Sequence, residues 1–328
     1  MVYIAVDLGG TNIRAARCDA EGRILARVGY PTRPEEGVEA VMARIIEAIR
    51  EVWPSDEPIE ALGVGVPGPL DPRTGVVLTA PNLGWENVPL ADRLREVFHV
   101  PCFVGNDANL AALGEWQYGA GRGHEHLVYL TISTGIGGGV ITHGVLLEGA
   151  HGLGAELGHI VVEARNGPRC GCGQTGCLEA VASGTAIARM AREAWARGDP
   201  VPWTDPSAVT AADVAKAAAQ GDPVAGAIMD RAAFYLGVGI ASFWHIFNPT
   251  LVILGGGVMK AGDWFLERIR AYARERAMTP DYVTPIVRTA LGDNVGLLGA
   301  LAYARIRYAH GSPASPSGGR LGAAESSS

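Results

Sequence analysis

Three thiols and one imidazole gather in a short stretch of the chain, and together they could hold a metal ion. Cys170, Cys172 and Cys177 lie within eight residues, and His159 precedes the first of them by eleven. Such a set completes a tetrahedral zinc site with no open position, which favours structural Zn²⁺. A disulfide is the rival interpretation, but a C-x-C pair is strained in that role. His151 competes with His159 as the fourth ligand.

Two glycine-rich turns could hold phosphate groups. Glycine lacks a Cβ, so successive backbone N–H groups can point into one concavity that binds phosphate oxygens. A plain hairpin turn is the alternative, although four glycines in five positions argue against it in the second turn. The candidate residues are Asp7, Gly9, Gly10, Thr11 and Asn12 in the first turn, and Ser133, Thr134, Gly135, Gly137, Gly138 and Val140 in the second. Of these, the Asp7 carboxylate could hold Mg²⁺ through water.

A third glycine run, Gly255, Gly256 and Gly257, follows the apolar segment 251–254. It predicts either a place where a flat ring lies against bare backbone or a simple entry into a helix.

Asn106 and Asp107 stand between an apolar segment and a helical pattern. The positive end of a helix stabilises a carboxylate there, and the usual role of such a residue is to cap the helix. If the position opens into a cleft, the same carboxylate is a general base for a hydroxyl group. The sequence leaves both roles open.

These residues need a scaffold, and the chain repeats one pattern that supplies it. A strand, a glycine turn and a second strand occur at 2–8 and 12–18, and again at 127–134 and 140–147 with a turn over 135–139. The repeat indicates either two similar α/β domains that face each other or two unrelated hairpins. Apolar spacing predicts helices over 37–53, 89–98 and 107–118, and mostly helices after residue 178.

Composition excludes several classes of protein. Of 328 residues 48% are hydrophobic and 19% charged, which supports a folded core rather than disorder. The net charge of −7 gives no basic surface for nucleic acid. The uncharged stretches 127–147 and 232–259 are interrupted by glycine and polar residues, so we expect no membrane span, no signal peptide and a cytoplasmic protein. Residues 311–328, rich in Ser, Gly, Ala and Pro, are predicted to be a disordered tail.

Taken in order, these motifs resemble the ROK family of sugar kinases and sugar-responsive repressors, and within it the bacterial glucokinases. The resemblance runs from about residue 2 to 308. It rests on Asp7-x-Gly-Gly-Thr, Gly65-Val-Pro-Gly68, Asn106-Asp-Ala-Asn109, Thr134-Gly-x-Gly-Gly-Gly139, Glu156-x-Gly-His159 and Cys170-x-Cys-Gly-x-x-Gly-Cys-Leu-Glu179.

The resemblance implies an actin-like, hexokinase-type (ribonuclease H-like) α/β fold of two domains with a central cleft. The expected organisation is a small domain over 1–118, a large domain over 119–296, a C-terminal helix over 297–310 that returns to the small domain, and the tail. A homodimer or homotetramer is expected.

The resemblance also assigns roles to residues. Asp107 would be the catalytic base, the two glycine turns would hold the ATP phosphates, and Gly255–Gly257 would hold the adenosine. His159 would serve both zinc, with the three cysteines, and the sugar. The remaining sugar-binding residues would be Gly68, Asn82, Asn106, Glu156 and Glu179.

The implied activity is transfer of phosphate from Mg²⁺-bound ATP to the 6-hydroxyl of glucose. N-acetylglucosamine, N-acetylmannosamine, fructose or allose are alternative substrates, and polyphosphate or ADP are alternative donors. A sugar-sensing repressor is disfavoured, because its DNA-binding domain would have to precede Asp7 and the chain is acidic. A zinc-stapled scaffold would explain the cysteines but not Asp107 or the glycine turns.

Overall fold

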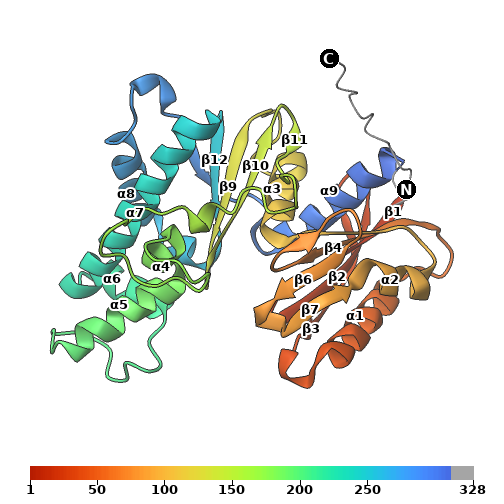
Figure 1. Ribbon diagram of the computed structural model, residues 1–328, viewed down its shortest axis with the longest axis horizontal. Helices are drawn as coiled ribbons and strands as arrows, with labels where there is room; N and C mark the ends of the chain where they lie inside the picture. Colours follow the sequence, from red (N-terminus) through yellow and green to blue (C-terminus); the bar gives the residue numbers. More distant parts are fainter. Residues whose placement is uncertain (312–328) are drawn as a thin grey trace, which may run out of the picture.

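The computed structural model describes residues 1–311, and two five-stranded sheets form its framework (Figure 1). The first sheet contains β1 (Val2–Leu8), β2 (Asn12–Asp19), β3 (Ile24–Pro31), β4 (Ile59–Val66) and β8 (Cys102–Asn106). The second contains β9 (Leu127–Ile132), β10 (Ile136–Thr142), β11 (Val145–Leu146), β12 (Leu251–Gly255) and β13 (Ile286–Arg288). A small third sheet contains β5 (Leu70–Asp71), β6 (Val76–Ala80) and β7 (Trp85–Pro89).

The two large sheets share one topology. Their strand orders are β3-β2-β1-β4-β8 and β11-β10-β9-β12-β13. In each sheet the first three strands of the order pair antiparallel, and the last two add in parallel. This confirms the prediction of two similar α/β halves. The exact domain boundaries stay a prediction, and residues 312–328 of the predicted tail lie outside the described part of the chain.

Helices cover both faces of the sheets. They are α1 (Val38–Val52), α2 (Leu90–Phe98), α3 (Asp107–Tyr118), α4 (Leu178–Ala182), α5 (Gly184–Ala196), α6 (Ala211–Ala219), α7 (Pro223–Phe247), α8 (Asp263–Arg274) and α9 (Val295–Ala309). Strand β1 shows why two layers form, because side chains alternate along a strand. Ile4 and Val6 join the core under α1, whereas Tyr3 and Ala5 join a different core on the opposite face.

Helices α3 and α9 fill the space between the two sheets. The core that contains them takes residues from both sheets, including Tyr3 and Ala5 of β1 and Tyr129 and Ile253 of β9 and β12. Helix α3 is accordingly buried on all sides from residue 108 to 115. It therefore packs against both halves of the molecule and carries Asn106 and Asp107 at its beginning.

The structure corrects three details of the predicted elements. The expected turn over 135–139 ends early, because Gly137, Gly138 and Gly139 pair with β9 inside strand β10. The stretch after β4, which carries no predicted element, forms the small third sheet. The apolar segment 251–254 forms strand β12, and β13 was missed, since three residues give too short a pattern.

Among the described helices, α7 alone is long and apolar enough to cross a membrane. Most of its apolar residues are buried in the fold, among them Leu236, Ile240 and Trp244, which are fully buried. It is therefore the core helix of the second half.

Candidate active site

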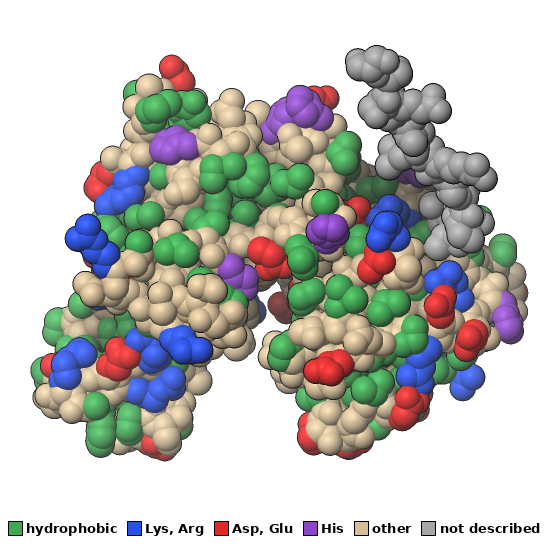
Figure 2. Space-filling view, in the orientation of Figure 1, with side chains coloured by type: hydrophobic (Ala, Val, Ile, Leu, Met, Phe, Trp, Pro, Cys, Tyr) green, Lys and Arg blue, Asp and Glu red, His purple; other side chains and the backbone are tan. Residues whose placement is uncertain are grey.

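A cleft separates the two halves, and acidic and histidine side chains gather near its closed end (Figure 2). A cavity of about 320 Å³ lies between the halves. Asp7, Arg14 and Asp107 line it from the first half and from α3, and Gly256 and Lys260 line it from the second. The structure thus brings the predicted base and the predicted Mg²⁺-binding carboxylate into one cavity.

The sequence left two roles open for this position, a helix cap and a carboxylate in a cleft, and the structure assigns the cap to Asn106. Asn106 is the cap of α3, because its side-chain oxygen accepts hydrogen bonds from the backbone N–H groups of Ala108 (3.0 Å) and Asn109 (3.1 Å). Asp107 begins the helix, and only its Oδ1 is used locally, as acceptor from Ala108 N–H (2.8 Å). Its second oxygen is thereby left available to a substrate in the cavity.

The surroundings of Asp107 tune its acidity. Burial raises the pKa of this carboxyl to about 6, against the opposing hydrogen bond from Ala108. The negative charges of Asp7 and Glu156 raise the pKa further. Such a value suits a general base, which must be ionised near neutral pH yet still hold a proton well.

Asp7 is the residue before the last one of strand β1, next to the first glycine turn. Its carboxylate lies 3.4 Å from Arg14 across the hairpin. Burial raises the pKa of Asp7, and the charge of Arg14 opposes that rise. Helix α9 passes so close that a Cβ on Gly296 would lie 2.6 Å from the carboxylate carbon of Asp7.

The rest of the first turn packs within its own half. Thr32 Oγ1 donates to the Gly9 carbonyl (2.6 Å), and Gly10 lies against Asn82. Thr11 and Asn12 are exposed. Gly68 lies between β4 and β5, where its backbone packs against the carbonyl of Thr79. Asn82 and Gly68 are thus placed by the first half, beside the first turn and the small sheet respectively.

The second turn is tied to the predicted sugar-binding residue Glu179. The backbone N–H of Ile136 donates to Glu179 Oε2 (2.9 Å). Gly135 makes this approach feasible, since a Cβ there would lie 2.4 Å from the same oxygen. Gly137 and Gly139 instead let α3 pack on β10, with Ala108 and Ala112 as the close neighbours. The abundance of glycine therefore reflects helix packing as well as the turn.

Glu156 precedes a short 3-10 helix, Leu157–His159, at the end of a loop from β11, and His159 is the last residue of that helix. Burial raises the pKa of Glu156, and Glu179 raises it further while His159 lowers it. His159 and Glu179 lie together, because Cys170 Sγ is 3.6 Å from His159 Nδ1 and 3.6 Å from Glu179 Oε1. Glu156 is close enough to Asp107 for its negative charge to raise the pKa of that carboxyl.

The predicted zinc ligands come together. One donor atom from each of His159, Cys170, Cys172 and Cys177 lies within 4.8 Å of all the others. The Cys172 and Cys177 sulfurs are 3.7 Å apart, and Cys170 Sγ is 3.6 Å from His159 Nδ1. Two sulfurs bound to one tetrahedral zinc at about 2.3 Å would be about 3.8 Å apart, so the set fits the ion. His151, the competing ligand, is outside this set.

A second cavity, of about 740 Å³, adjoins the first through Gly257 and Lys260. Its walls are largely apolar, with Val209, Ala215 and Val258 among them. Ser133 and Thr134 of the second turn line it as well. Gly256 shapes the junction, because its φ is +91° and a Cβ would lie 2.2 Å from the Ile132 carbonyl oxygen.

Sequence reasoning missed two cations of the central cavity, Lys260 and Arg288. Lys260 pairs with Asp293 (3.8 Å), and Arg288 donates to Asp263 (2.7 Å). Within residues 1–311, Arg288 Nε and one Nη remain buried without a partner. Lys260 follows β12 and Arg288 ends β13, at the same sheet edge as Gly256, a position that could have singled them out.

The doubled α/β fold and the carboxylate-lined cleft define an actin-like sugar kinase of the hexokinase type. The sequence matches the ROK family over residues 3–307, and the chain belongs to that family. The glucokinase of Thermotoga maritima is 44% identical over 93% of this chain and 97% of its own length.

Solved structures show the same relationship. A ROK hexokinase from Thermus thermophilus is 39% identical, with a TM-score of 0.82 over 95% of this chain and 100% of that one. A ROK glucokinase from Streptomyces griseus, solved with glucose and AMPPNP, is 36% identical, with a TM-score of 0.80 over 93% and 100%.

Proposed function

We propose that this protein is a glucokinase, which transfers the γ-phosphoryl group of ATP to the 6-hydroxyl of glucose. The observation that carries the proposal is Asp107, a carboxylate with one free oxygen and a raised pKa, in a cavity that it shares with Asp7. The Thermotoga relative is a glucokinase, and the Streptomyces relative binds glucose and an ATP analogue.

Each part of the reaction then has a residue. Asp107 would accept the proton of the 6-hydroxyl as its oxygen attacks phosphorus, while Asn106, Glu156, His159 and Glu179 would bind the other sugar hydroxyls. Asp7 and the turn residues Gly9–Asn12 and Thr134–Gly138 would hold the phosphates. Phosphoryl transfer asks mainly for such positioning and charge neutralisation. Mg²⁺ bound with ATP would supply much of the neutralisation, and Asp7 would hold it.

The adenosine would occupy the second cavity. Its apolar walls suit a base, and its junction with the central cavity at Gly257 directs the phosphates toward Asp7. Lys260 and Arg288 would add positive charge beside the phosphates and so help to neutralise them.

Structural Zn²⁺ completes the proposal. His159 points Nδ1 at the cysteines, which leaves Nε2 for a sugar hydroxyl. The ion would fix the segment 159–179, whose two ends carry His159 and Glu179. We expect the enzyme in the cytoplasm, with its substrates.

The test is ADP release with Mg-ATP and a panel of glucose, N-acetylglucosamine, N-acetylmannosamine, mannose, fructose and allose. The expected result is the highest kcat/KM for glucose. Preference for another sugar would overturn glucose as the substrate. Turnover with polyphosphate but not ATP would overturn ATP as the donor, and glucose binding without turnover on any donor would overturn the kinase assignment.

A further inference from the structure

The loop that ends at Glu156 begins with a second carboxylate, Glu148. The loop leaves β11, and Glu148 N–H donates to Leu146 (3.1 Å). At the other end Gly154 N–H donates to the carbonyl of Glu148 (2.8 Å), so the loop closes on this residue. The position of Glu148 therefore affects the whole loop.

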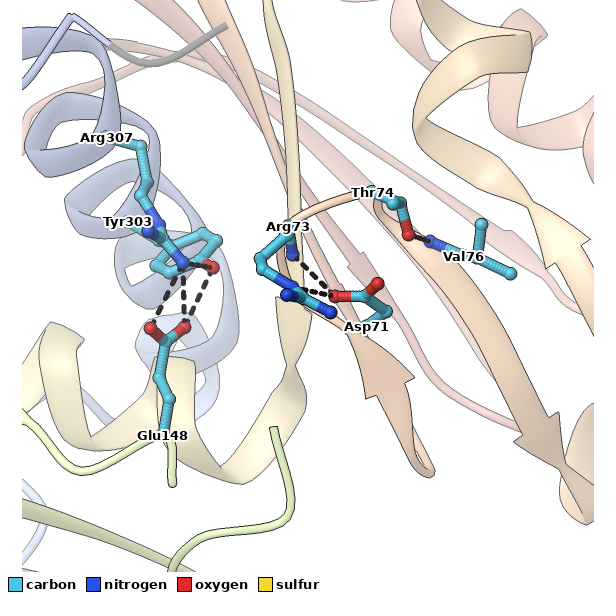
Figure 3. Close-up of polar contacts among 7 residues, drawn as sticks. All are labelled: Asp71, Arg73, Thr74, Val76, Glu148, Tyr303 and Arg307. Carbon is cyan, nitrogen blue, oxygen red and sulfur yellow. Dashed lines mark hydrogen bonds and ion pairs between the residues drawn. The ribbon is translucent and has the colours of Figure 1, made fainter. Parts of the chain in front are cut away.

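The Glu148 side chain crosses from the second half of the molecule to helix α9 (Figure 3). Tyr303 donates its hydroxyl to Glu148 Oε1 (3.0 Å), and Arg307 Nη2 lies 3.1 Å from each carboxylate oxygen. Arg307 also donates to the Tyr303 hydroxyl (2.9 Å) and lies over its ring. The three side chains form a closed cluster.

This cluster is not an ordinary surface ion pair. Tyr303 is 3% exposed, and the Glu148 and Arg307 side chains are each 29% exposed. Partly desolvated, charge-assisted hydrogen bonds are stronger than exposed ones, because water screens them less. Helix α9 in turn packs on β1 and β4 of the first half, so the cluster anchors the loop to the half that contains Asp7.

The remainder of the loop needs such an anchor. Gly152 lies against Leu70 and Pro72 of the small sheet. Ala155, the residue before Glu156, has a φ of +63°, a left-handed conformation that costs about 1 kcal/mol for a residue with a Cβ. Strain of this kind persists only where surrounding contacts hold it.

We propose that Glu148 is a positioning residue of the sugar site, which, with Tyr303 and Arg307, holds the loop 147–156 on α9 and thereby fixes the position of Glu156. The inference rests on the proposed function for its kinetic consequences, but its structural part concerns the loop alone. Glu148 itself is not placed in contact with the substrate.

The kinetic test is Glu148→Ala. The KM for glucose should rise by about tenfold, the value of a charge-assisted hydrogen bond, while the KM for ATP stays unchanged and kcat falls less. Arg307→Ala should reproduce the effect, and the double variant should add nothing to it. Glu148→Gln should recover part of it, since an amide oxygen still accepts from Tyr303.

Arg73→Ala is the matched control. Arg73 donates to Asp71 (3.3 Å) beside the cluster in Figure 3, but both residues belong to one hairpin and the Arg73 side chain is 83% exposed. It should change neither KM. If Glu148→Ala lowers only the melting temperature and leaves the KM for glucose unchanged, Glu148 is a structural strut and the proposal is wrong.

A second measurement needs no substrate. Amide hydrogen exchange over residues 149–156 should be faster in Glu148→Ala than in the wild type, with the rest of the chain unchanged. Equal protection of the loop in both proteins would overturn the proposal. A wild type that does not phosphorylate glucose, together with a deprotected loop in the variant, would overturn the proposed function and leave the anchor in place.

Discussion

Asp107 shows at the scale of one residue how activity and stability oppose each other. We expect Asp107→Asn to lower kcat by a factor of about 10² to 10⁴, because the amide cannot accept the hydroxyl proton. Glucose binding measured by calorimetry should persist. Asp281→Asn, which changes an exposed carboxylate outside both cavities, is the control and should leave kcat unchanged. Near-normal kcat in Asp107→Asn would contradict the role of base.

The raised pKa of Asp107 sets a pH dependence. The base acts when ionised, so kcat/KM should fall with a slope of one as the pH drops through about 6. The stability of the fold changes with pH in the opposite direction to the activity. The folded protein binds this proton more tightly than the unfolded chain, so the stability that the proton confers is present at low pH and lost as pH rises through about 6.

Asp107→Asn should therefore be more stable than the wild type at pH 7, by on the order of 1 kcal/mol, and the difference should vanish near pH 4. Urea denaturation at both pH values measures it. If the variant and the wild type are equally stable at pH 7, burial does not disfavour the ionised form of Asp107.

At the scale of elements, the proposed zinc ion would fix a segment that has few regular elements of its own. Cys172→Ser should lose stoichiometric zinc by metal analysis and lower the melting temperature, since metal binding is coupled to folding. The KM for glucose should rise because His159 and Glu179 lose their support. Cys102→Ala removes a buried thiol outside the cluster and should keep the zinc. Full zinc occupancy in Cys172→Ser would exclude that thiol as a ligand.

Gly256 and Gly257 are adjacent yet should respond differently to substitution. A Cβ on Gly256 would collide with the Ile132 carbonyl at a positive φ, whereas on Gly257 the nearest atom is 4.0 Å away. Gly256→Ala should destabilise the fold by more than about 1 kcal/mol, and Gly257→Ala should not. Denaturation midpoints of the two variants test this, and equal midpoints would contradict the steric argument.

The elements that the sequence predicts well are those with a clear pattern. Strand β1 is a nearly continuous apolar run that ends at a glycine turn, and helix α1 follows helical spacing. The predicted zinc ligands follow from residue types that have few other uses. The small sheet was hidden because its strands have two to five residues between turns. Gly137 and Gly139 look like turn residues because a sequence does not show the helix that packs on them.

At the scale of the whole molecule, Glu115 lies where the two halves join. It is fully buried in α3 and accepts hydrogen bonds from both connecting segments, namely from Ala120 N–H (2.8 Å), Ala290 N–H (3.2 Å), Leu291 N–H (3.0 Å) and the Thr289 hydroxyl. The sequence does not reveal this role, because Glu115 there is one polar residue within a helix and its partners lie up to 176 residues away.

Glu115→Ala would leave several buried donors without a partner and should destabilise the protein by roughly 3 kcal/mol or more. Glu115→Gln has one acceptor oxygen fewer, so its stability should lie between that of Glu115→Ala and that of the wild type. Glu125→Ala changes an exposed residue of the first connecting segment and serves as the control. Chemical denaturation measures all three, and a Glu115→Ala variant as stable as the control would show that water replaces the carboxylate.

The Glu115 carboxylate also makes one point of α3 a fixed point, because it holds both connecting segments there. Asp107 lies eight residues from this point, about 12 Å along the helix. A rotation of α3 by only about 10° around Glu115 would move Asp107 by about 2 Å, the difference between a hydrogen bond and none. Small changes in the angle between the two halves would thus become large displacements of Asp107, the proposed base.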